Sequence, residues 1–248
     1  MQMQLTPGSV KDHYDTFLAG HYLWMAGGFE ANAGRNRDFF TTHNIRPSRT
    51  GRAVDLGAGC GFVTIPLAEA GFRVIAVDFC RPLLDELRGH VHSPVEIIAG
   101  DMMDFPAWAG RRPEVITCMG DTLTHLPDAG AVRNLLRQCN RELVQGGRFV
   151  LSLRDYSGEP EGNVAIIPVR RDADRIFLCR LEYSADAVVV TDILFSRISG
   201  TWERSASGYA KLRLAPARVS EMMDEAGFRI NFLSAENGMI IFLGVKSD

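Results

Sequence analysis

Short apolar runs alternate with helix-compatible stretches through the middle of the chain, and this alternation limits the fold more than any other feature. Five such runs occur, at residues 53–56, 72–77, 95–99, 115–119 and 149–153. Strands that are apolar on both sides and separated by helices are typical of a parallel sheet covered on both faces. The pattern predicts an α/β fold with a Rossmann-like sheet.

The intervening stretches carry helix end signals. We expect helices at residues 61–70, 81–88 and 129–143. Gly71 suits the end of the first, because glycine adopts a left-handed conformation without a steric penalty. Pro82 suits the opening turn of the second, where its missing N–H costs nothing.

The remainder of the chain departs from the βα repeat. We expect two helices before residue 50, at 10–25 and 34–43, and a helix at 216–226. Strands at 228–235 and 239–245 flank Asn237-Gly238, a hairpin signal that completes a seven-stranded sheet. Four antiparallel strands precede them, at 166–170, 175–183, 187–198 and 209–214.

These elements predict a helical lid over residues 1–50 and one domain over residues 51–248. An inserted antiparallel sheet occupies about residues 160–214 of that domain. The insertion serves either as a roof over an acceptor pocket or as the surface of a homodimer, and the sequence leaves both open.

Composition excludes several function classes. Lysine and arginine number 27 against 30 acidic residues, and this net charge of −3 gives no reason to expect a nucleic-acid partner. The longest apolar runs are too short to span a membrane, and residues 1–7 do not resemble a signal peptide, so we expect a cytoplasmic protein. Five cysteines without close pairs predict neither disulfides nor a metal site.

The first apolar run leads into Gly57, Gly59 and Gly61, where a ligand can approach the backbone. The spacing is G-x-G-x-G, whereas a dinucleotide-binding loop has G-x-G-x-x-G. Asp55, at the strand end, would repel a pyrophosphate but suits a ligand that carries an ammonium and a sulfonium. Asp78 follows the next strand, 21 residues after Gly57, where a carboxylate can accept ribose hydroxyls.

Asp101 and Met102 follow the third strand, where they can bind an adenine ring. Taken alone, the loop could be a turn and each carboxylate a cap or turn residue. Together they resemble the class I S-adenosylmethionine (SAM)-dependent methyltransferases from about Arg52 onward. That resemblance implies SAM as cofactor, with Asp55, Gly57 and Gly59 at its methionine part, Asp78 at the ribose, and Asp101 and Met102 at the adenine. We expect the cofactor site also to include Tyr14, Arg35, Phe79 and Met119.

Two segments at the same sheet edge predict an acceptor site. The loop Gly120-Asp121-Thr122-Leu123-Thr124-His125-Leu126-Pro127 and the strand end Arg154-Asp155-Tyr156 resemble the glycine and sarcosine N-methyltransferase group. The resemblance implies that Arg154 holds an acceptor carboxylate, although Asp121 and Asp155 replace the usual asparagines. Asp121, His125 or Tyr156 could take the proton of an acceptor amine.

The aromatic residues of the N-terminal segment add a further expectation. Tyr14 is placed near the sulfonium, Trp24 near the acceptor, and Arg35 or Arg37 at the cofactor carboxylate. Structural roles remain open as alternatives. The aromatic residues could belong to the core, His125 could be a core histidine, and Arg154 could form an ion pair with Asp121 or Asp155.

The sequence therefore predicts an enzyme that methylates a small molecule, at an amine or amino-acid-like nitrogen. An O- or C-methyltransferase of a small metabolite and a non-catalytic SAM-binding protein are the alternatives. An NAD-dependent oxidoreductase is disfavoured by the glycine spacing and by the absence of a Tyr-x-x-x-Lys pair. A nucleic-acid methyltransferase is disfavoured by the charge and by the absence of an Asn-Pro-Pro-Tyr loop.

Overall fold

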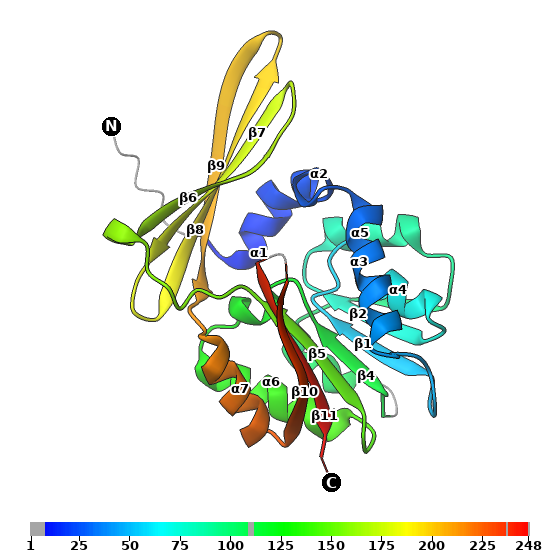
Figure 1. The fold of residues 1–248 in the computed structure, drawn as a ribbon. Coiled ribbons are helices and arrows are strands. Elements are labelled where there is room, and N and C mark those ends of the chain that lie inside the picture. The colour runs from blue at the N-terminus through cyan, green and yellow to red at the C-terminus, as the bar shows by residue number, and fades with distance from the viewer. Residues whose placement is uncertain (1–7, 109–111, 237, 248) are drawn as a thin grey trace.

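A seven-stranded sheet forms the centre of the computed structural model, which describes residues 8–108, 112–236 and 238–247 (Figure 1). Its strands are β1 (Arg52–Leu56), β2 (Arg73–Asp78), β3 (Val95–Ala99), β4 (Val115–Cys118), β5 (Arg148–Leu153), β10 (Phe228–Glu236) and β11 (Met239–Lys246). They lie in the order β10-β11-β5-β4-β1-β2-β3. Strands β1 to β5 are parallel, and β11 runs antiparallel to β5 and β10. This order confirms the predicted Rossmann-like sheet, and each predicted parallel strand agrees within one residue.

Helices cover both faces of this sheet. They are α3 (Phe29–Thr42), α4 (Thr64–Glu69), α5 (Arg81–His90), α6 (Ala129–Glu142) and α7 (Pro216–Glu225). Alternate residues of a strand point to opposite faces. On β5, Phe149 and Leu151 accordingly pack with α6 and α7, whereas Val150 packs with α3 and α4. The core is thus two apolar layers with the sheet between them.

The first helix after the glycine loop is shorter than predicted. We expected it from Gly61, but α4 begins at Thr64. Gly57, Gly59 and Gly61 all have positive φ angles, of 72°, 52° and 97°. A right-handed helix cannot include such residues, so the loop must end before helical geometry begins.

The N-terminal segment also differs from the prediction. Instead of one helix over residues 10–25 it has α1 (Val10–His13), a π-helical turn (Tyr14–Leu18), a 3-10 turn (Ala19–His21) and α2 (Tyr22–Ala26). Gly27, at φ 94°, ends α2. In Figure 1 this segment lies between the two sheets, and α3 then runs along the larger one.

The insertion forms a separate four-stranded antiparallel sheet with strands β6 (Val164–Arg171), β7 (Arg175–Tyr183), β8 (Ala187–Ile198) and β9 (Thr201–Leu212). Strand β9 begins eight residues before the predicted 209, because residues 201–208 are mostly polar and give no apolar alternation. They pair with β8 throughout, at a distance from the core where polar side chains meet water (Figure 1).

The final hairpin pairs Phe228 with Lys246 and Glu236 with Met239, as predicted from the turn signal. Asn237 of that signal lies outside the described residues. Within the part of the chain that the structure describes, no helix has the length and apolar character needed to cross a membrane.

Glu114 anchors the segment that leads into β1. Its carboxylate accepts hydrogen bonds from the backbone N–H groups of Ser48, Arg49 and Gly51, at 2.8, 2.7 and 2.6 Å, and from the Ser48 hydroxyl at 2.7 Å. Burial acts to raise the pKa of Glu114, but these donors outweigh it and lower the pKa to about 2.

Replacing Glu114 with glutamine is expected to lower the free energy of unfolding at pH 7 by about 2 kcal/mol. The reason is that the glutamine NH2 group would face backbone N–H groups, which cannot accept a hydrogen bond from it. The carboxylate stabilises fully above its ordinary pKa of 4.5, and this contribution is lost as pH falls toward 2. Urea unfolding at pH 7 and pH 3 should therefore show the gap between the two proteins narrowing at pH 3. An equal gap at both values would contradict this account.

Candidate functional site

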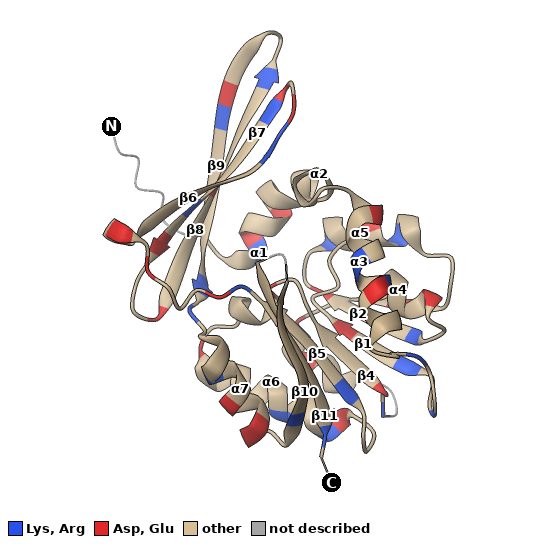
Figure 2. Cartoon of the chain, viewed as in Figure 1, with Lys and Arg blue, Asp and Glu red and all other residues tan. Residues whose placement is uncertain are grey.

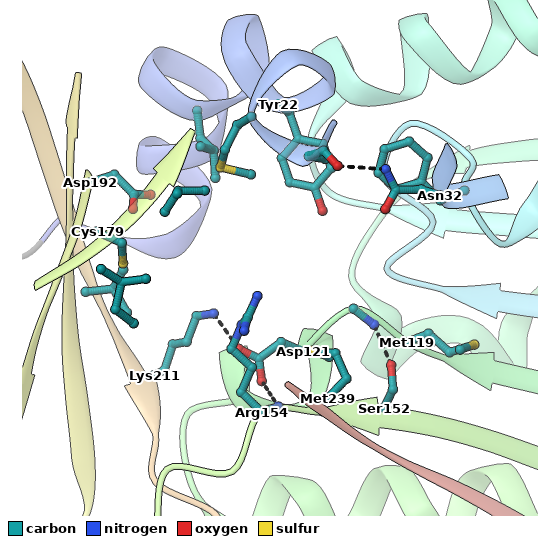
Figure 3. Close-up of a pocket in the computed structure, with 18 of the residues that line it drawn as sticks. Tyr22, Asn32, Met119, Asp121, Ser152, Arg154, Cys179, Asp192, Lys211 and Met239 are labelled. Carbon is teal, nitrogen blue, oxygen red and sulfur yellow. Dashed lines mark hydrogen bonds and ion pairs between the residues drawn. The ribbon is translucent and has the colours of Figure 1, made fainter. Parts of the chain in front are cut away.

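A cavity of about 600 Å³ lies where the two sheets and the N-terminal helices meet. Figure 3 shows side chains pointing into it from three directions: Asp192, Cys179 and Lys211 from the inserted sheet, Tyr22 and Asn32 from the N-terminal helices, and Met119, Ser152 and Arg154 from the strand ends of the larger sheet. The carboxyl ends of parallel strands are where open α/β sheets bind ligands. The cavity is therefore the candidate site.

A buried ion pair forms the floor of this cavity. Lys211 Nζ lies 2.6 Å from Asp121 Oδ2, and both side chains are less than one tenth exposed. The same oxygen accepts a hydrogen bond from the Tyr156 hydroxyl at 2.9 Å, and Oδ1 accepts one from the backbone N–H of Arg154 at 3.0 Å. Asp121 thus joins β9 to the loop after β4 and to the end of β5.

The pKa shifts of Asp121 and Lys211 keep both residues charged. Burial acts to raise the pKa of Asp121, but the Lys211 ammonium outweighs it, so the pKa lies below its ordinary value. Burial likewise acts to lower the pKa of Lys211, and Asp121 raises it. Burial raises the pKa of Tyr156 well above the ordinary value. The structure therefore brings two predicted proton acceptors together. Asp121 is ionised and accepts a hydrogen bond from the neutral hydroxyl of Tyr156.

His125, the third predicted catalytic residue, lies in an aromatic cluster behind this floor. Its ring centroid is 5.5 Å from that of Tyr14 and 5.7 Å from that of Tyr209. Burial lowers the pKa of His125 to about 3, so the imidazole is neutral at pH 7. Its Nε2 atom is buried and has no hydrogen-bond partner among the described residues.

The glycine loop after β1 packs closely against the loop after β4. A Cβ atom on Gly57 would lie against Thr122, whose hydroxyl donates to the carbonyl of Met119 at 2.8 Å. Only a residue without a side chain fits there, at φ 72°. Met119 lines the cavity, so the loop and the cavity wall are in direct contact through Thr122.

Asp55 is enclosed beneath this loop. Its two carboxylate oxygens accept hydrogen bonds from the Thr64 and Thr117 hydroxyls at 2.6 and 2.7 Å, and the residue is 1% exposed. Burial raises the pKa of Asp55 to about 6, against the lowering effect of both hydroxyls. In this structure the side chain ties β1 to α4 and β4, and its predicted contact with the methionine part of SAM stays a prediction.

The remaining strand-end residues lie beside the cavity and do not line it. Asp78, at the end of β2, accepts hydrogen bonds from the backbone N–H groups of Gly59 and Cys80 at 2.8 and 2.7 Å. Asp101 accepts one from Met103 at 2.8 Å and begins a 3-10 turn that contains Met102. The ring of Phe79 meets Tyr14 edge-on at 5.9 Å. Tyr14 lines the cavity, so Phe79 contacts the cavity wall through it.

The predicted N-terminal residues have different surroundings. Arg35 lines the cavity, and its guanidinium donates a hydrogen bond to the Asn32 side chain at 3.2 Å. Arg37, the alternative at the cofactor carboxylate, is paired with Glu30 and Glu69. Trp24 stacks under the Arg175 guanidinium at 4.2 Å and does not line the cavity. Arg35 is thus the better placed arginine.

Arg154 lines the cavity from the end of β5 (Figure 3). Its backbone N–H donates to Asp121, but its guanidinium forms no ion pair within the described residues. The structural alternative of an ion pair with Asp121 or Asp155 is therefore not what this structure shows. An unpaired guanidinium at a cavity wall can make a two-pronged bond to a carboxylate.

Sequence reasoning missed the polar side chains that the inserted sheet contributes. Besides Lys211 these include Asp192, whose carboxylate lies 3.0 Å from His13 Nε2. The other ring nitrogen of His13 lies 2.9 Å from the Ser207 hydroxyl, so α1 is attached to β8 and β9. An available signal was the spacing of Tyr209 and Lys211, which places a lysine on the inward face of β9.

Among the described residues, no group of three or more His, Cys, Asp or Glu side chains could hold a metal ion. All five cysteines are free thiols. In the view of Figure 2, basic and acidic residues are interspersed over both sheets and the helices.

Replacing Asp121 with asparagine is expected to lower the free energy of unfolding by about 3–5 kcal/mol, because the buried Lys211 ammonium would lose its carboxylate. Adding Lys211→Met to this variant is expected to recover most of the loss, since methionine fills similar space without a charge. Denaturant unfolding of both single variants and the double variant measures the coupling. Losses that simply add would show that the two residues are independent.

A family model described as a methyltransferase domain matches residues 53–147, from β1 to the turn before β5. The chain is 35% identical over 116 residues to a cypemycin N-terminal methyltransferase from Streptomyces sp, covering 46% of each chain. It is 29% identical to the glycine/sarcosine N-methyltransferase of Halorhodospira halochloris, covering 52% of this chain and 49% of that one.

Similarity extends to an O-methyltransferase. The chain is 32% identical to a ubiquinone biosynthesis O-methyltransferase from Methylococcus capsulatus, covering 48% of this chain and 49% of that one. The chain spans about half the length of the curated relatives it matches. These relatives therefore do not single out one acceptor atom.

Solved structures share the fold over nearly the whole chain. A S-adenosylmethionine-dependent methyltransferase from Clostridium acetobutylicum superposes with a TM-score of 0.74 at 14% identity, covering 95% of this chain and 96% of that one. The SAM-bound amino pentose methyltransferase CalS10 from Micromonospora echinaspora gives 0.71 at 17%, covering 90% and 94%. Residues 53–147 thus match a methyltransferase domain, and the whole chain has the fold of the solved SAM-dependent methyltransferases.

Proposed function

We propose that this protein is an enzyme that transfers the methyl group of SAM to a nitrogen atom of a small amine or amino-acid-like acceptor. One observation carries the proposal: the methyltransferase-domain match includes the glycine loop and Asp78, and the adjoining cavity has two arginines, Arg35 and Arg154, without acidic partners among the described residues. Two free guanidinium groups fit two ligands that each carry a carboxylate.

The residues present suit SAM. The glycine loop packs closely on Thr122, which a Cβ on Gly57 would prevent, and each oxygen of Asp78 retains a lone pair for a ribose hydroxyl. Arg35 would hold the cofactor carboxylate. When bound, SAM supplies an electrophilic methyl group on a sulfonium, and the aromatic face of Tyr14 would attract that positive charge.

The chain's own contribution would be alignment and exclusion of water. Arg154 would fix the acceptor by its carboxylate, and the N-terminal helices, attached to the inserted sheet by His13 and Asp192, would close the cavity. The acceptor nitrogen must be neutral when it attacks. Of the three predicted proton acceptors, Asp121 and Tyr156 line the cavity, whereas His125 does not and its pKa of about 3 makes it a weak base.

A small acceptor agrees with the shape of the site. The cavity holds about 600 Å³ and is bounded by the inserted sheet, which leaves little room for a polymer. The N-methyltransferases among the relatives support nitrogen, whereas the O-methyltransferase keeps oxygen as the second candidate. A non-catalytic SAM-binding protein would show cofactor binding without turnover.

Calorimetric titration is expected to show binding of SAM and S-adenosylhomocysteine, and none of NAD. In Asp78→Ala the dissociation constants should rise about 10- to 100-fold, because a charged hydrogen-bond acceptor is lost. Asp85→Ala is the matched control, since the Asp85 side chain is 71% exposed on α5 and pairs with Arg88 of the same helix. Binding of NAD, or equal affinities in both variants, would contradict the proposed cofactor site.

Substitutions of the two arginines are expected to weaken the binding of different ligands. Arg35→Ala should raise the dissociation constant of S-adenosylhomocysteine about tenfold or more, whereas Arg154→Ala should raise the KM of a carboxylate-bearing acceptor and leave cofactor affinity unchanged. Arg141→Ala, on the exposed end of α6, serves as control. Steady-state kinetics with calorimetry distinguish these effects. An unchanged KM in Arg154→Ala would exclude the carboxylate clamp.

A further inference from the structure

The face of the inserted sheet that turns toward the cavity is largely apolar. We propose that the acceptor has an extended apolar body that packs on this face, so that the enzyme selects bulky amines and disfavours acceptors the size of glycine. The inference rests on the proposed function and names the substrate class of the same site.

The apolar residues of this face come from three neighbouring strands. They all line the cavity: Ile167 and Val169 on β6, Phe177 and Leu181 on β7, and Val190 on β8. Leu181 pairs directly with Val190, and Ile167 pairs with Cys179, which lies between Phe177 and Leu181. Side chains two residues apart on a strand share a face, so these residues form one continuous wall.

Part of this wall is open to water. Ile167 is 44% exposed and Val169 is 40% exposed. Of the seven large apolar side chains that are exposed in the described residues, Ile167 and Val169 line the cavity, whereas Val164 and Ile166, also on β6, do not. Exposed apolar surface at the rim of a ligand cavity marks a contact area, because a ligand that covers it removes that surface from water.

The opposite side of the cavity carries the Arg154 guanidinium at the end of β5 and the Ser152 hydroxyl, near Met119 (Figure 3). The charged side chains that the inserted sheet contributes, Asp192 and Lys211, are paired with His13 and Asp121. An acceptor held at Arg154 by a carboxylate would direct its remaining atoms toward β6 and β7. A glycine-sized molecule would leave the apolar wall uncovered, whereas a longer side chain would cover it.

A homologous series of amino acids tests this inference directly. The protein is saturated with S-adenosylhomocysteine and titrated calorimetrically with glycine, alanine, 2-aminobutyrate, norvaline and norleucine. Each methylene group buried against the wall should tighten binding about fourfold, which amounts to about sixtyfold between alanine and norleucine. A flat series, or glycine binding as tightly as norleucine, would overturn the inference.

Two adjacent residues of β6 provide a matched pair of variants. Ile167→Asp places a charge on the cavity wall and should abolish the increase in affinity along the series. Ile166→Asp places the same charge on the opposite face of the strand, where the residue is 63% exposed, and should preserve the increase. Thermal unfolding checks that both variants fold.

The outcomes separate this inference from the proposed function. If S-adenosylhomocysteine binds and Ile167→Asp retains the full increase, the apolar wall is not the acceptor site. If S-adenosylhomocysteine itself fails to bind, the proposed function is wrong and the acceptor inference falls with it.

Discussion

The ion pair between Asp121 and Lys211 holds together the parts of the chain that form the cavity. Burying two charges carries a desolvation cost, which is offset only where geometry is good and the remaining lone pairs are satisfied. Both conditions hold, because Asp121 also accepts hydrogen bonds from Tyr156 and from the backbone of Arg154. The inserted sheet is thereby fixed to the strand ends of the larger sheet.

The same contacts stabilise an unusual backbone. Gly120 and Asp121 follow each other with φ angles of 75°, and Asp121 has a side chain in a region that favours glycine. A residue held in that conformation depends on its surroundings. Two of the three partners of its side chain, Arg154 and Tyr156, lie in the segment after β5, and the third, Lys211, lies on β9, so the loop conformation depends on the insertion.

The larger sheet and its glycine loop could be predicted from sequence because their signals are local. Apolar runs mark β1 to β5, and the Gly57-Ala58-Gly59 run predicts a close turn wherever it occurs. The floor of the cavity could not be predicted in this way. Lys211 meets Asp121 across 90 residues of sequence, and Asp192 meets His13 across 179. Nothing in either neighbourhood specifies the other partner.

The N-terminal segment shows the same limit. Its apolar and aromatic residues indicated one helix, but Tyr14 and Leu18 both reach the cavity through a π-helical turn. Such turns add a residue to the helical repeat and redirect side chains. The prediction of Tyr14 at the site rested on resemblance, whereas its contacts with Phe79, His125 and Tyr209 depend on packing between segments.

The position of β11 has a consequence for folding. It lies between β5 and β10, and its residues 240–245 pair with residues 148–153 of β5. One edge of β5 therefore stays unpaired until the C-terminal hairpin has been synthesised, whereas β6 to β9 pair only with near neighbours in sequence. Because distant pairings form slowly, the insertion can fold on the ribosome first, and closure of the central sheet is the late step.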